Sequence, residues 1–307
     1  MKLGAVIVTY NRLELLKECI EACLKQSYPF QEIFIVNNAS TDGTLEYLKT
    51  LKNPKIKVLN SKENLGGAYG FYEGVKHFEN SKLDYILLID DDAMIDKDYN
   101  QEIVKYMDKD DTISGYSGIV KTNDEIQFEH RRHLKNLKIF KETKSTEEEY
   151  TKDFFDYELS TFCGLFIPVK LIKKIKYPSQ EFFIWFDDTE YSLRLLKYGK
   201  IRNVNKAILN HKTTISNQRG HNWKSYYSLR NKAIVLKRYF SKSQLRKYLF
   251  SLQMKRIAAK IFYYMRKAPY YKTLSEMYED AIKDGKKEKL GKNEKYTYQL
   301  KLQKRKV

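Results

Sequence analysis

Two clusters of acidic side chains are the residues of this chain best suited to chemistry. Each follows directly on an apolar or aromatic run, and together they comprise Asp90, Asp91 and Asp92, and Asp187, Asp188 and Glu190. Adjacent carboxylates repel one another and are costly to desolvate unless positive charge or hydrogen-bond donors compensate. Mg²⁺ and Mn²⁺ prefer oxygen ligands and commonly bridge carboxylates to phosphates. The pattern predicts a cation site at one cluster and a general base at the other.

His211, in the stretch LNHKTT, is a candidate nitrogen ligand for such a cation. A nitrogen ligand suits Mn²⁺ better than Mg²⁺. The alternatives are a surface histidine in a loop and, for residues 90–92, a capped helix start near Ala93. A helix cap needs only one acid, so that alternative does not explain three.

The first hundred residues alternate short apolar runs with amphipathic stretches. We expect strands at Leu3–Tyr10, Glu32–Asn37, Ile56–Asn60 and Tyr85–Asp90, most of them apolar throughout as buried parallel strands are. Helical spacing lies between the strands, at residues 13–24, 44–51 and 72–78. Right-handed crossovers would place the carboxyl ends of these strands on one edge of a parallel sheet, where open α/β sheets bind ligands.

A polar group follows each of these four strands. The groups are TYNR at 9–12, NNASTDGT at 37–44, NLGGAYG at 64–70 and DDD at 90–92. Any one of them is explained equally well by ordinary caps and turns. Four at one edge of a sheet favour a nucleotide-type site in a shared crevice.

The later part of the chain is less regular. The polar stretch at 141–150 is expected to be a surface loop or helix without chemistry, and the apolar stretch at 162–169 resembles a strand with a buried glycine. A helix is expected after the second acidic cluster, with Gly199 as its stop. The acids of that cluster would lie at the helix N-terminus, where the helix dipole favours anions.

The formal charge of +18 is concentrated at the C-terminal end. Residues 221–307 contain 24 Lys and Arg against 6 Asp and Glu, whereas residues 1–220 hold 33 of each. This asymmetry indicates a balanced catalytic domain followed by a basic module for an anionic partner. Three cysteines favour a reducing compartment, the N-terminal apolar stretch is too short for a signal peptide, and no run approaches the roughly 18 apolar residues of a membrane span.

Residues 244–267 have the pattern of a basic amphipathic helix, ended by Pro269. Its apolar positions fall near one stripe, namely Leu245, Leu249, Leu252, Ile257, Ile261 and Met265. Such a helix suits contact with an anionic membrane surface without spanning it. The alternative is a helix whose apolar stripe packs on the catalytic domain. Residues 283–307 are rich in charge and are expected to be loosely ordered.

The motifs TYNR, VNNASTDGT, LLIDDDAMI and WFDDTE together resemble those of family 2 glycosyltransferases of the GT-A fold, which are inverting enzymes that use nucleotide sugars. The resemblance covers residues 3–235. The stretches NLGGAYGFYEG and WKSYYSLRN look like the bacterial galactofuranosyl- and rhamnosyltransferase branch, with galactofuranosyl transfer favoured. Tyr69 departs from that branch, which commonly has glycine there.

The resemblance implies roles for individual residues. The nucleotide-sugar donor would be held by Thr9, Asn11, Arg12, Asn38, Asp42, Gly66, Gly67, Asp90 and Asp91. The metal, Mn²⁺ or Mg²⁺, would be held by Asp92, Asp90 and His211. Asp188 matches the catalytic base, with Asp187 as its rival and Glu190 beside them; Trp185 and Glu190 would contact the acceptor, although a tryptophan here is more often core. Arg230 and Asn231 would close over the diphosphate, or Arg230 would be a surface arginine.

These expectations define one enzyme. A GT-A domain at 1–235, with a donor half at 1–95 and an acceptor half at 96–235, precedes a basic helical tail at 236–307. The α/β domain has a Rossmann-like, mostly parallel mixed sheet flanked by helices. The donor is UDP-galactofuranose, or alternatively dTDP-rhamnose or another UDP-hexose, and the acceptor is a glycan or polyprenyl-linked glycan of bacterial cell-surface polysaccharide synthesis. The protein would be cytoplasmic, bound peripherally to the inner face of the plasma membrane through 244–267, and an oligomer is possible.

Three other classes compete with this interpretation. The basic tail suggests a nucleic-acid-binding protein, but no recognised nucleic-acid motif occurs. A phosphatase or nucleotidyltransferase would use residues 90–92 for Mg²⁺, but no activated nucleophile or glycine-rich phosphate loop accompanies them. A scaffold without catalysis would not need intact acids in both clusters.

Overall fold

The chain forms two compact units. The computed structural model describes residues 1–136, 138–212, 221–297 and 300. Within these, the first unit comprises residues 1–134, 142–180 and 188–212, and the second comprises 135–136, 138–141, 181–187, 221–297 and 300.

A mixed sheet forms the centre of the first unit. Its strands are β1 (Leu3–Thr9), β2 (Glu32–Asn37), β3 (Ile56–Asn60), β4 (Tyr85–Asp90), β5 (Ala93–Ile95), β6 (Ile113–Thr122), β7 (Glu125–Ile126), β10 (Phe154–Tyr157), β12 (Leu165–Pro168) and β13 (Lys200–His211). Their order is β10-β13-β6-β12-β4-β1-β2-β3, with β5 beside β13 and β7 beside β6. A second, smaller sheet joins β11 (Leu159–Ser160), β8 (Arg131–Asn136) and β9 (Ile139–Lys144) in the order β11-β8-β9.

The four strands predicted in the first hundred residues are confirmed. β1 pairs in parallel with β2 and β4, and β2 with β3. β12 runs antiparallel to both β4 and β6, so its first residues lie at the edge where β4 ends. The carboxyl ends of the parallel strands and the start of β12 therefore meet at one edge, which the polar loops occupy.

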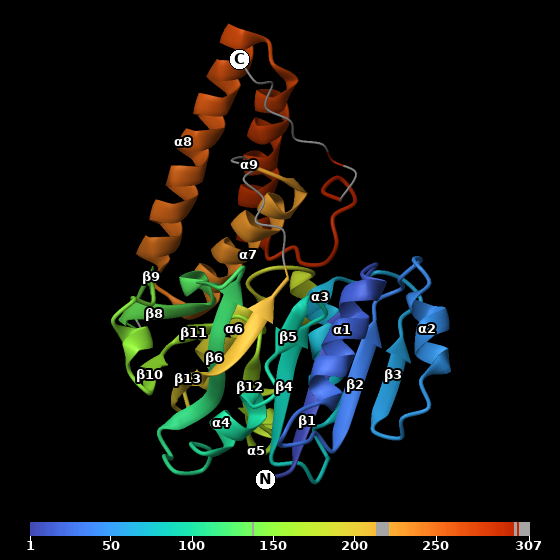
Figure 1. The fold of residues 1–307 in the computed structure, drawn as a ribbon. Helices are drawn as coiled ribbons and strands as arrows, with labels where there is room; N and C mark the ends of the chain where they lie inside the picture. The colour runs from blue at the N-terminus through green and yellow to red at the C-terminus, as the bar shows by residue number, and fades with distance from the viewer. Residues whose placement is uncertain (137, 213–220, 298–299, 301–307) are drawn as a thin grey trace. The chain divides into compact units, whose positions relative to one another are not determined.

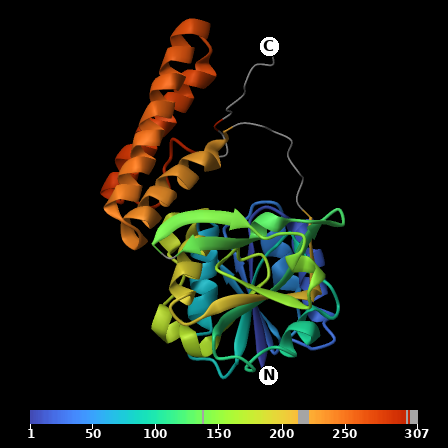
Figure 2. The same ribbon diagram turned by 90° about the vertical axis from the view of Figure 1, so that its left-hand side faces the viewer.

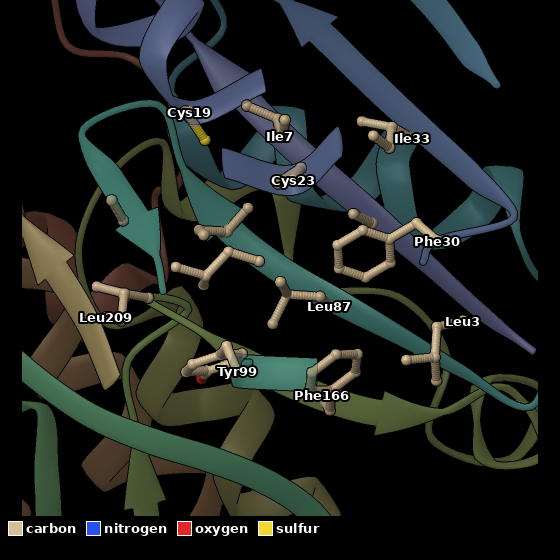
Figure 3. Close-up of a cluster of buried hydrophobic side chains, with 14 of the residues drawn as sticks. Leu3, Ile7, Cys19, Cys23, Phe30, Ile33, Leu87, Tyr99, Phe166 and Leu209 are labelled. Atoms are coloured by element: carbon tan, nitrogen blue, oxygen red, sulfur yellow. The ribbon is translucent and has the colours of Figure 1, made fainter. Parts of the chain in front are cut away.

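Helices cover both faces of this sheet because its strands bury side chains on both sides. One face carries α1 (Leu13–Leu24), α2 (Thr44–Thr50) and α4 (Tyr99–Val104), and the other carries α3 (Gly67–His77), α5 (Val169–Ile175) and α6 (Asp187–Leu195) (Figure 1). Alternate residues of β1 enter the two cores: Ile7 lies with Cys19 and Cys23 of α1, as Figure 3 shows, and Val6 lies on the opposite face. All three cysteines of the chain are buried free thiols.

Helix α3 begins five residues before the predicted start at Tyr72. The helix contains glycine at 67, 70 and 74, and the first two lower the helix propensity of the part that the sequence pattern did not reveal. Two of them are needed for packing against β1. A Cβ atom added at Gly70 would lie 2.4 Å from Val8 Cγ1, and one added at Gly74 would lie 2.1 Å from Val6 Cγ1. The glycines thus allow α3 to approach the strand closely.

This contact yields a stability prediction. Gly74→Ala is expected to lower the free energy of unfolding by about 1–3 kcal/mol, because the added methyl overpacks the contact with Val6. Gly67→Ala is the matched control, since a Cβ added there has no neighbour within 4 Å in the part of the chain that the structure describes. Urea unfolding followed by circular dichroism measures both. Equal midpoints for the two variants would show that α3 can move away from β1.

Two predictions about the middle of the chain need correction. The polar stretch at 141–150, expected to be a loop or helix, continues β9 to Lys144 and then forms a 3-10 turn at Glu149–Thr151. Pairing with β8 provides the hydrogen bonds that a polar sequence alone does not reveal. The expected strand at 162–169 begins only at Leu165, because Gly164 before it has a φ of +81°.

The second unit contains α7 (Trp223–Tyr239), α8 (Lys242–Arg266) and α9 (Pro269–Lys287). Figure 2 shows α8 and α9 lying side by side as a hairpin. α7 has a capping box formed by Asn222 and Ser225, and Ser241 caps α8. Pro269 not only follows α8 but also opens α9, at a position that tolerates the missing N–H group.

The predicted tail differs from this unit in three ways. The expectation that 283–307 is loosely ordered is wrong for 283–297: α9 continues to Lys287, and Tyr296 is buried and stacks on Tyr226 with ring centroids 4.2 Å apart. Residues 298, 299 and 301–307 lie outside the described residues. The predicted apolar stripe of α8 is divided, since Leu252 is buried while Ile257, Ile261 and Met265 are exposed. No helix among the described residues is long and apolar enough to cross a membrane.

The compact units divide the chain at a different place from the predicted 235/236 boundary. α7 packs against α8 and α9, so it groups with the tail helices. Residues 135–136, 138–141 and 181–187 also belong to this helical unit. The catalytic domain at 1–235 is a functional division, and its extent stays a prediction.

Candidate active site

The loops after β1 and β2 are held together by the polar residues predicted there. Asn11, with a φ of +53°, accepts a hydrogen bond from Thr41 N at 2.7 Å. Asp42 accepts from Leu13 N at 2.9 Å and from Thr44 Oγ1 at 2.6 Å, so one carboxylate orients the starts of α1 and α2. Burial would raise the pKa of Asp42, but these hydrogen bonds hold it below its ordinary value. Asn11 and Asp42 therefore fix the shape of the loops.

The glycine loop before α3 is fastened to the end of β2. Asn38 donates from Nδ2 to Asn64 Oδ1 at 2.9 Å and accepts from Leu65 N at 3.0 Å. Gly66 has a φ of +88°, a conformation that favours glycine. Space is open beside Gly67, where a Cβ would meet no atom of the described residues within 4 Å. The backbone at Gly67 is thus accessible to a ligand, and Asn38 acts on the loop rather than pointing freely outward.

The first acidic cluster has its compensating positive charge in Arg12. The Arg12 guanidinium lies 3.2 Å from Asp91 Oδ1 and also bonds Asp92 Oδ2. Asp91 accepts in addition from Tyr10 N at 3.3 Å. Three carboxylates in sequence are therefore tolerated because a neighbouring loop supplies a cationic side chain.

The pKa values of the triplet diverge. Burial and the neighbouring carboxylate of Asp92 raise the pKa of Asp90 to about 7. Burial raises the pKa of Asp91 to about 6, against the opposing effect of Arg12. Burial would also raise the pKa of Asp92, but His211 and Arg12 hold it below the ordinary value. Asp92 is accordingly the carboxylate of the triplet most strongly held in the ionised form.

His211 lies beside Asp92 because strand pairing places it there. It ends β13 opposite Ala93 of β5, and its Nε2 is 3.2 Å from Asp92 Oδ1. Burial would lower the pKa of His211, but Asp92 raises it. Among the described residues, the other ring nitrogen, His211 Nδ1, is buried without a hydrogen-bond partner.

This unsatisfied nitrogen and the Asp92 carboxylate beside the same ring fit a divalent cation. Buried polar atoms without partners are rare and point to a missing ligand. A carboxylate oxygen with an adjacent imidazole nitrogen is a donor set that Mn²⁺ accepts. In the described part of the chain, no three His, Cys, Asp or Glu side chains converge as a metal site, so Asp90 does not complete one with Asp92 and His211. Two protein ligands are enough where substrate phosphates supply the others.

The second acidic cluster opens α6. Asp188 accepts from Thr189 Oγ1 at 3.0 Å, and its pKa is raised by burial against the opposing charge of Arg132. Asp187 is buried and is the first residue of the helix. Glu190 is also buried and accepts from Arg194 Nη2 at 2.7 Å, which gives it a structural partner. Asp188 is the more exposed of the three acids.

A short basic segment connects the two acidic clusters. The rings of His130 and His211 pack edge to face, with centroids 5.3 Å apart. Two residues further on, Arg132 donates to Thr189 Oγ1 at 2.9 Å, directly beside Asp188. Asp188, whose pKa is raised, thus borders the same region as the pair of Asp92 and His211. This arrangement suits the removal of a proton beside a bound anion.

His130 and Arg132 are site residues that sequence reasoning missed. The run FEHRRH is the available signal, but it lies in an irregular stretch whose sequence alone does not indicate a site. Burial lowers the pKa of His130 well below its usual range, so the ring is neutral beside His211. Arg131, between them, is fully buried and donates to the carbonyls of Gly118 and Cys163, so its role is structural.

The prediction that Arg230 and Asn231 close over a diphosphate is wrong, and Arg230 is not a surface residue. Asn231 Nδ2 lies 3.1 Å from Phe182 O, 3.1 Å from Ile184 O and 2.8 Å from Trp185 O. Arg230 is buried and also donates to Phe182 O, at 3.1 Å. The Asn231 amide thus binds the backbone that leads to the second acidic cluster, and Arg230 joins it there through one guanidinium nitrogen and donates to Gly291 O through another.

The backbone they hold is strained. Phe183, Trp185 and Phe186 have φ values of +68°, +63° and +69°, which non-glycine residues rarely adopt. Trp185, predicted to contact the acceptor, is 43% exposed rather than part of a core. The Asn231 amide therefore holds Trp185 in a conformation that the chain would not otherwise keep.

Removing this amide is expected to release the segment. Asn231→Ala leaves the carbonyl groups of Ile184 and Trp185 without this donor, which costs about 1–3 kcal/mol of stability. Hydrogen exchange should rise most at 183–186, as measured by mass spectrometry. Ser228→Ala, on the same helix, is the control and should leave exchange unchanged. Protection of 183–186 equal to that of the unmodified protein would show that other contacts hold the segment.

Comparison with known proteins finds related sequences. A family model described as "Glycosyl transferase family 2" matches residues 5–169. The chain is 26% identical over 198 residues to galactofuranosyltransferase GlfT1 of Mycolicibacterium smegmatis, covering 64% of the chain and 65% of that protein. It is 28% identical over 113 residues to an uncharacterized glycosyltransferase of Haemophilus influenzae, covering 36% of the chain and 34% of that protein.

Solved structures show the same fold. The chain resembles the crystal structure of GalNAc-T7 with UDP, GalNAc and Mn²⁺, with a TM-score of 0.62 and 16% identity. The match covers 94% of the chain and 56% of that protein. The chain thus spans less than two thirds of the length of each of these proteins.

Proposed function

The chain belongs to glycosyl transferase family 2, and we propose that it transfers a sugar from UDP-galactofuranose to a glycan hydroxyl with inversion of configuration. The observation that carries the proposal is the connection, through His130 and Arg132, of a buried Asp92–His211 pair with Asp188. The likeness to GlfT1 over 64% of the chain supports the choice of donor. A dTDP-rhamnose or other UDP-hexose transferase is the alternative.

The donor would lie along the edge where the parallel strands end. Thr9 has a buried hydroxyl at the end of β1, and Gly67 offers open backbone. The loops that carry them are pre-shaped by Asn11, Asn38 and Asp42, so little conformational entropy is lost when the nucleotide binds. The proposed role of Asn11, Asn38 and Asp42 in donor binding is therefore to position the loops.

A divalent cation held by Asp92 and His211, Mn²⁺ in preference to Mg²⁺, would neutralise charge on the departing diphosphate. The imidazole must be deprotonated to act as a ligand. Arg12, which already bonds Asp91 and Asp92, adds a second positive charge at the same place. We propose that Asp90 lies near Asp92 and His211 without binding the cation itself.

Asp188 is the proposed general base. It would take the proton of the acceptor hydroxyl while that oxygen attacks the anomeric carbon opposite the departing nucleotide, which inverts the configuration. Burial raises its pKa, and a base is most effective when its pKa approaches the working pH. Asp187 is more buried and Glu190 is paired with Arg194, so both are weaker candidates.

The acceptor is proposed to be a glycan or polyprenyl-linked glycan of cell-surface polysaccharide synthesis. Trp185 is exposed and can offer its ring to a sugar face. A lipid-linked acceptor would place the protein at the inner face of the plasma membrane. The basic α8 is consistent with that location.

A donor panel tests the proposed reaction. The protein is incubated with Mn²⁺, a polyprenyl-linked glycan and, in turn, UDP-galactofuranose, dTDP-rhamnose and UDP-hexoses, and release of the nucleoside diphosphate is followed. UDP release is expected with UDP-galactofuranose. Release from dTDP-rhamnose alone would move the assignment to the alternative, and release from no donor would overturn it.

A further inference from the structure

The outer side of α8 carries a continuous apolar surface. The helix packs on α9 through Leu252 and Ala259, which are buried (Figure 2). Its opposite side presents five apolar residues spaced three or four apart, which we call the outer stripe: Phe250, Met254, Ile257, Ile261 and Met265. Their exposed fractions run from 38% at Ile257 to 72% at Met265. An apolar stripe of this length on an exposed helix indicates a partner surface.

Basic side chains flank the outer stripe. Arg246, Lys247 and Lys260 are exposed and lie at helical positions beside it. The sequence of α8, Lys242–Arg266, contains seven Lys and Arg and no Asp or Glu. Arg256, by contrast, lies on the inner side and pairs with Glu279 of α9. The outer side therefore combines apolar surface with positive charge.

This combination distinguishes between possible partners. A second copy of the helix would bring two sets of cationic flanks together, and like charges repel. Nucleic acid would satisfy the flanks, but its phosphates offer nothing to Met and Ile side chains. An anionic bilayer supplies both acyl chains for the stripe and negative headgroups for the flanks.

We propose that the outer side of α8 lies in the headgroup region of an anionic lipid bilayer, with the outer stripe at the acyl boundary and Arg246, Lys247 and Lys260 on lipid phosphates. The helix would lie in the interface, since seven charges in 25 residues are incompatible with spanning. This inference rests on the membrane location in the proposed function and names the surface that would contact the membrane. Lipid binding is measured without sugar transfer, so a failure of the lipid proposal can be told apart from a failure of the proposed reaction.

Vesicle sedimentation of the full chain tests the proposal. Vesicles of phosphatidylglycerol and phosphatidylcholine are compared with vesicles of phosphatidylcholine alone, at low and high NaCl. We expect binding to the anionic vesicles, at least about tenfold weaker binding to the neutral ones, and loss of binding as salt rises. Equal binding to both, or no binding to either, would overturn the proposal.

Two variant pairs locate the surface. Arg246→Gln/Lys247→Gln/Lys260→Gln should weaken binding at least about tenfold, whereas Lys52→Gln/Lys55→Gln/Lys57→Gln, with the same loss of charge in the first unit, should not. Ile257→Gln/Ile261→Gln should also weaken binding. Its control is Leu24→Gln/Ile139→Gln, which changes two residues of similar exposure elsewhere. If a variant and its control lose the same amount of vesicle binding, the loss comes from net charge or general hydrophobicity. That result would overturn the assignment of the outer side of α8 as the binding surface.

Two further measurements decide between lipid and the rival partners. Sedimentation velocity of the Ile257→Gln/Ile261→Gln variant reports self-association, and titration with single-stranded RNA reports nucleic-acid binding. Stripe-dependent dimers or flank-dependent RNA binding, without vesicle binding, would overturn the lipid assignment. All variants should retain the unfolding midpoint of the unmodified protein and its transfer to a short soluble glycan acceptor, since the changed residues are exposed.

Discussion

Asp188→Asn is expected to reduce the rate of sugar transfer about 10²–10⁴-fold and to leave donor binding unchanged. The amide has nearly the shape of the carboxylate, so its neighbours Thr189 and Arg132 should stay in place. It does not accept the proton of the acceptor hydroxyl, and general-base assistance is lost. Initial rates measure the first effect, and titration calorimetry with UDP measures the second.

Two further variants make this result specific. Asp187→Asn tests the neighbouring acid, which is the more buried of the pair and should affect the rate less. Asp111→Asn, on the exposed surface, controls for the loss of one negative charge. Rates for Asp188→Asn equal to those of the Asp111→Asn control would remove the assignment of Asp188 as base. A larger loss in Asp187→Asn would transfer the role to that residue.

Asp92→Asn is expected to weaken UDP binding in the presence of Mn²⁺ by at least about tenfold, the scale at which groups supporting a metal act. The substitution removes the charge that His211 and Arg12 share. In the unmodified protein, Mn²⁺ with UDP at about 100 times Kd should stabilise the fold by about 2.7 kcal/mol. The variant should lose most of that stabilisation, which thermal unfolding with and without EDTA measures.

A control six residues away completes this experiment. Asp98→Asn removes an exposed carboxylate and should keep both the Mn²⁺ effect and the UDP affinity. His211→Gln should resemble Asp92→Asn, because the two side chains are proposed to hold the same cation. Protection by UDP that is identical with Mn²⁺ and with EDTA would mean that the donor binds here without a metal.

The donor half of the fold could be predicted from sequence because its strands can be recognised from their residue pattern. Strands β1, β2 and β4 are buried on both faces, so they read as nearly unbroken apolar runs, and their bounds agree with those expected to within one residue. β9 could not be recognised, because it is polar and acquires its identity by pairing with β8. The local residue pattern identifies buried apolar strands such as β1, whereas a polar strand such as β9 is determined by its pairing partner in the folded protein.

The candidate site divides in the same way. The two acidic clusters stand out by residue type alone, since adjacent carboxylates after an apolar run demand an explanation. The partners of those acids are distant in sequence: Arg12 is about 80 residues from Asp92, and Arg132 is 57 residues from Thr189. Arg230 and Asn231 were assigned to the wrong ligand because a sequence does not show that α7 faces the carbonyls of residues 182–185.

The tail shows a limit of helical periodicity. The spacing in α8 correctly predicts a helix, observed at Lys242–Arg266. It also contains two apolar sides, and the pattern alone does not tell which of them packs on a neighbour. The structure assigns Leu252 to the inner side and Ile261 to the outer side, so the stripe drawn through both was wrong.

The two close-packed glycines of α3 bear on how the proposed sugar donor would be selected. Val6 and Val8 of β1 pack against Gly74 and Gly70 of α3. If α3 slid along β1, one of these valines would clash with a side chain next to the glycine. The loop at its N-terminus is consequently anchored, and a larger sugar does not gain room by pushing it aside. Donor preference should then change through single side-chain exchanges around a rigid frame, with Tyr69, on the first turn of the helix, as the natural place to begin.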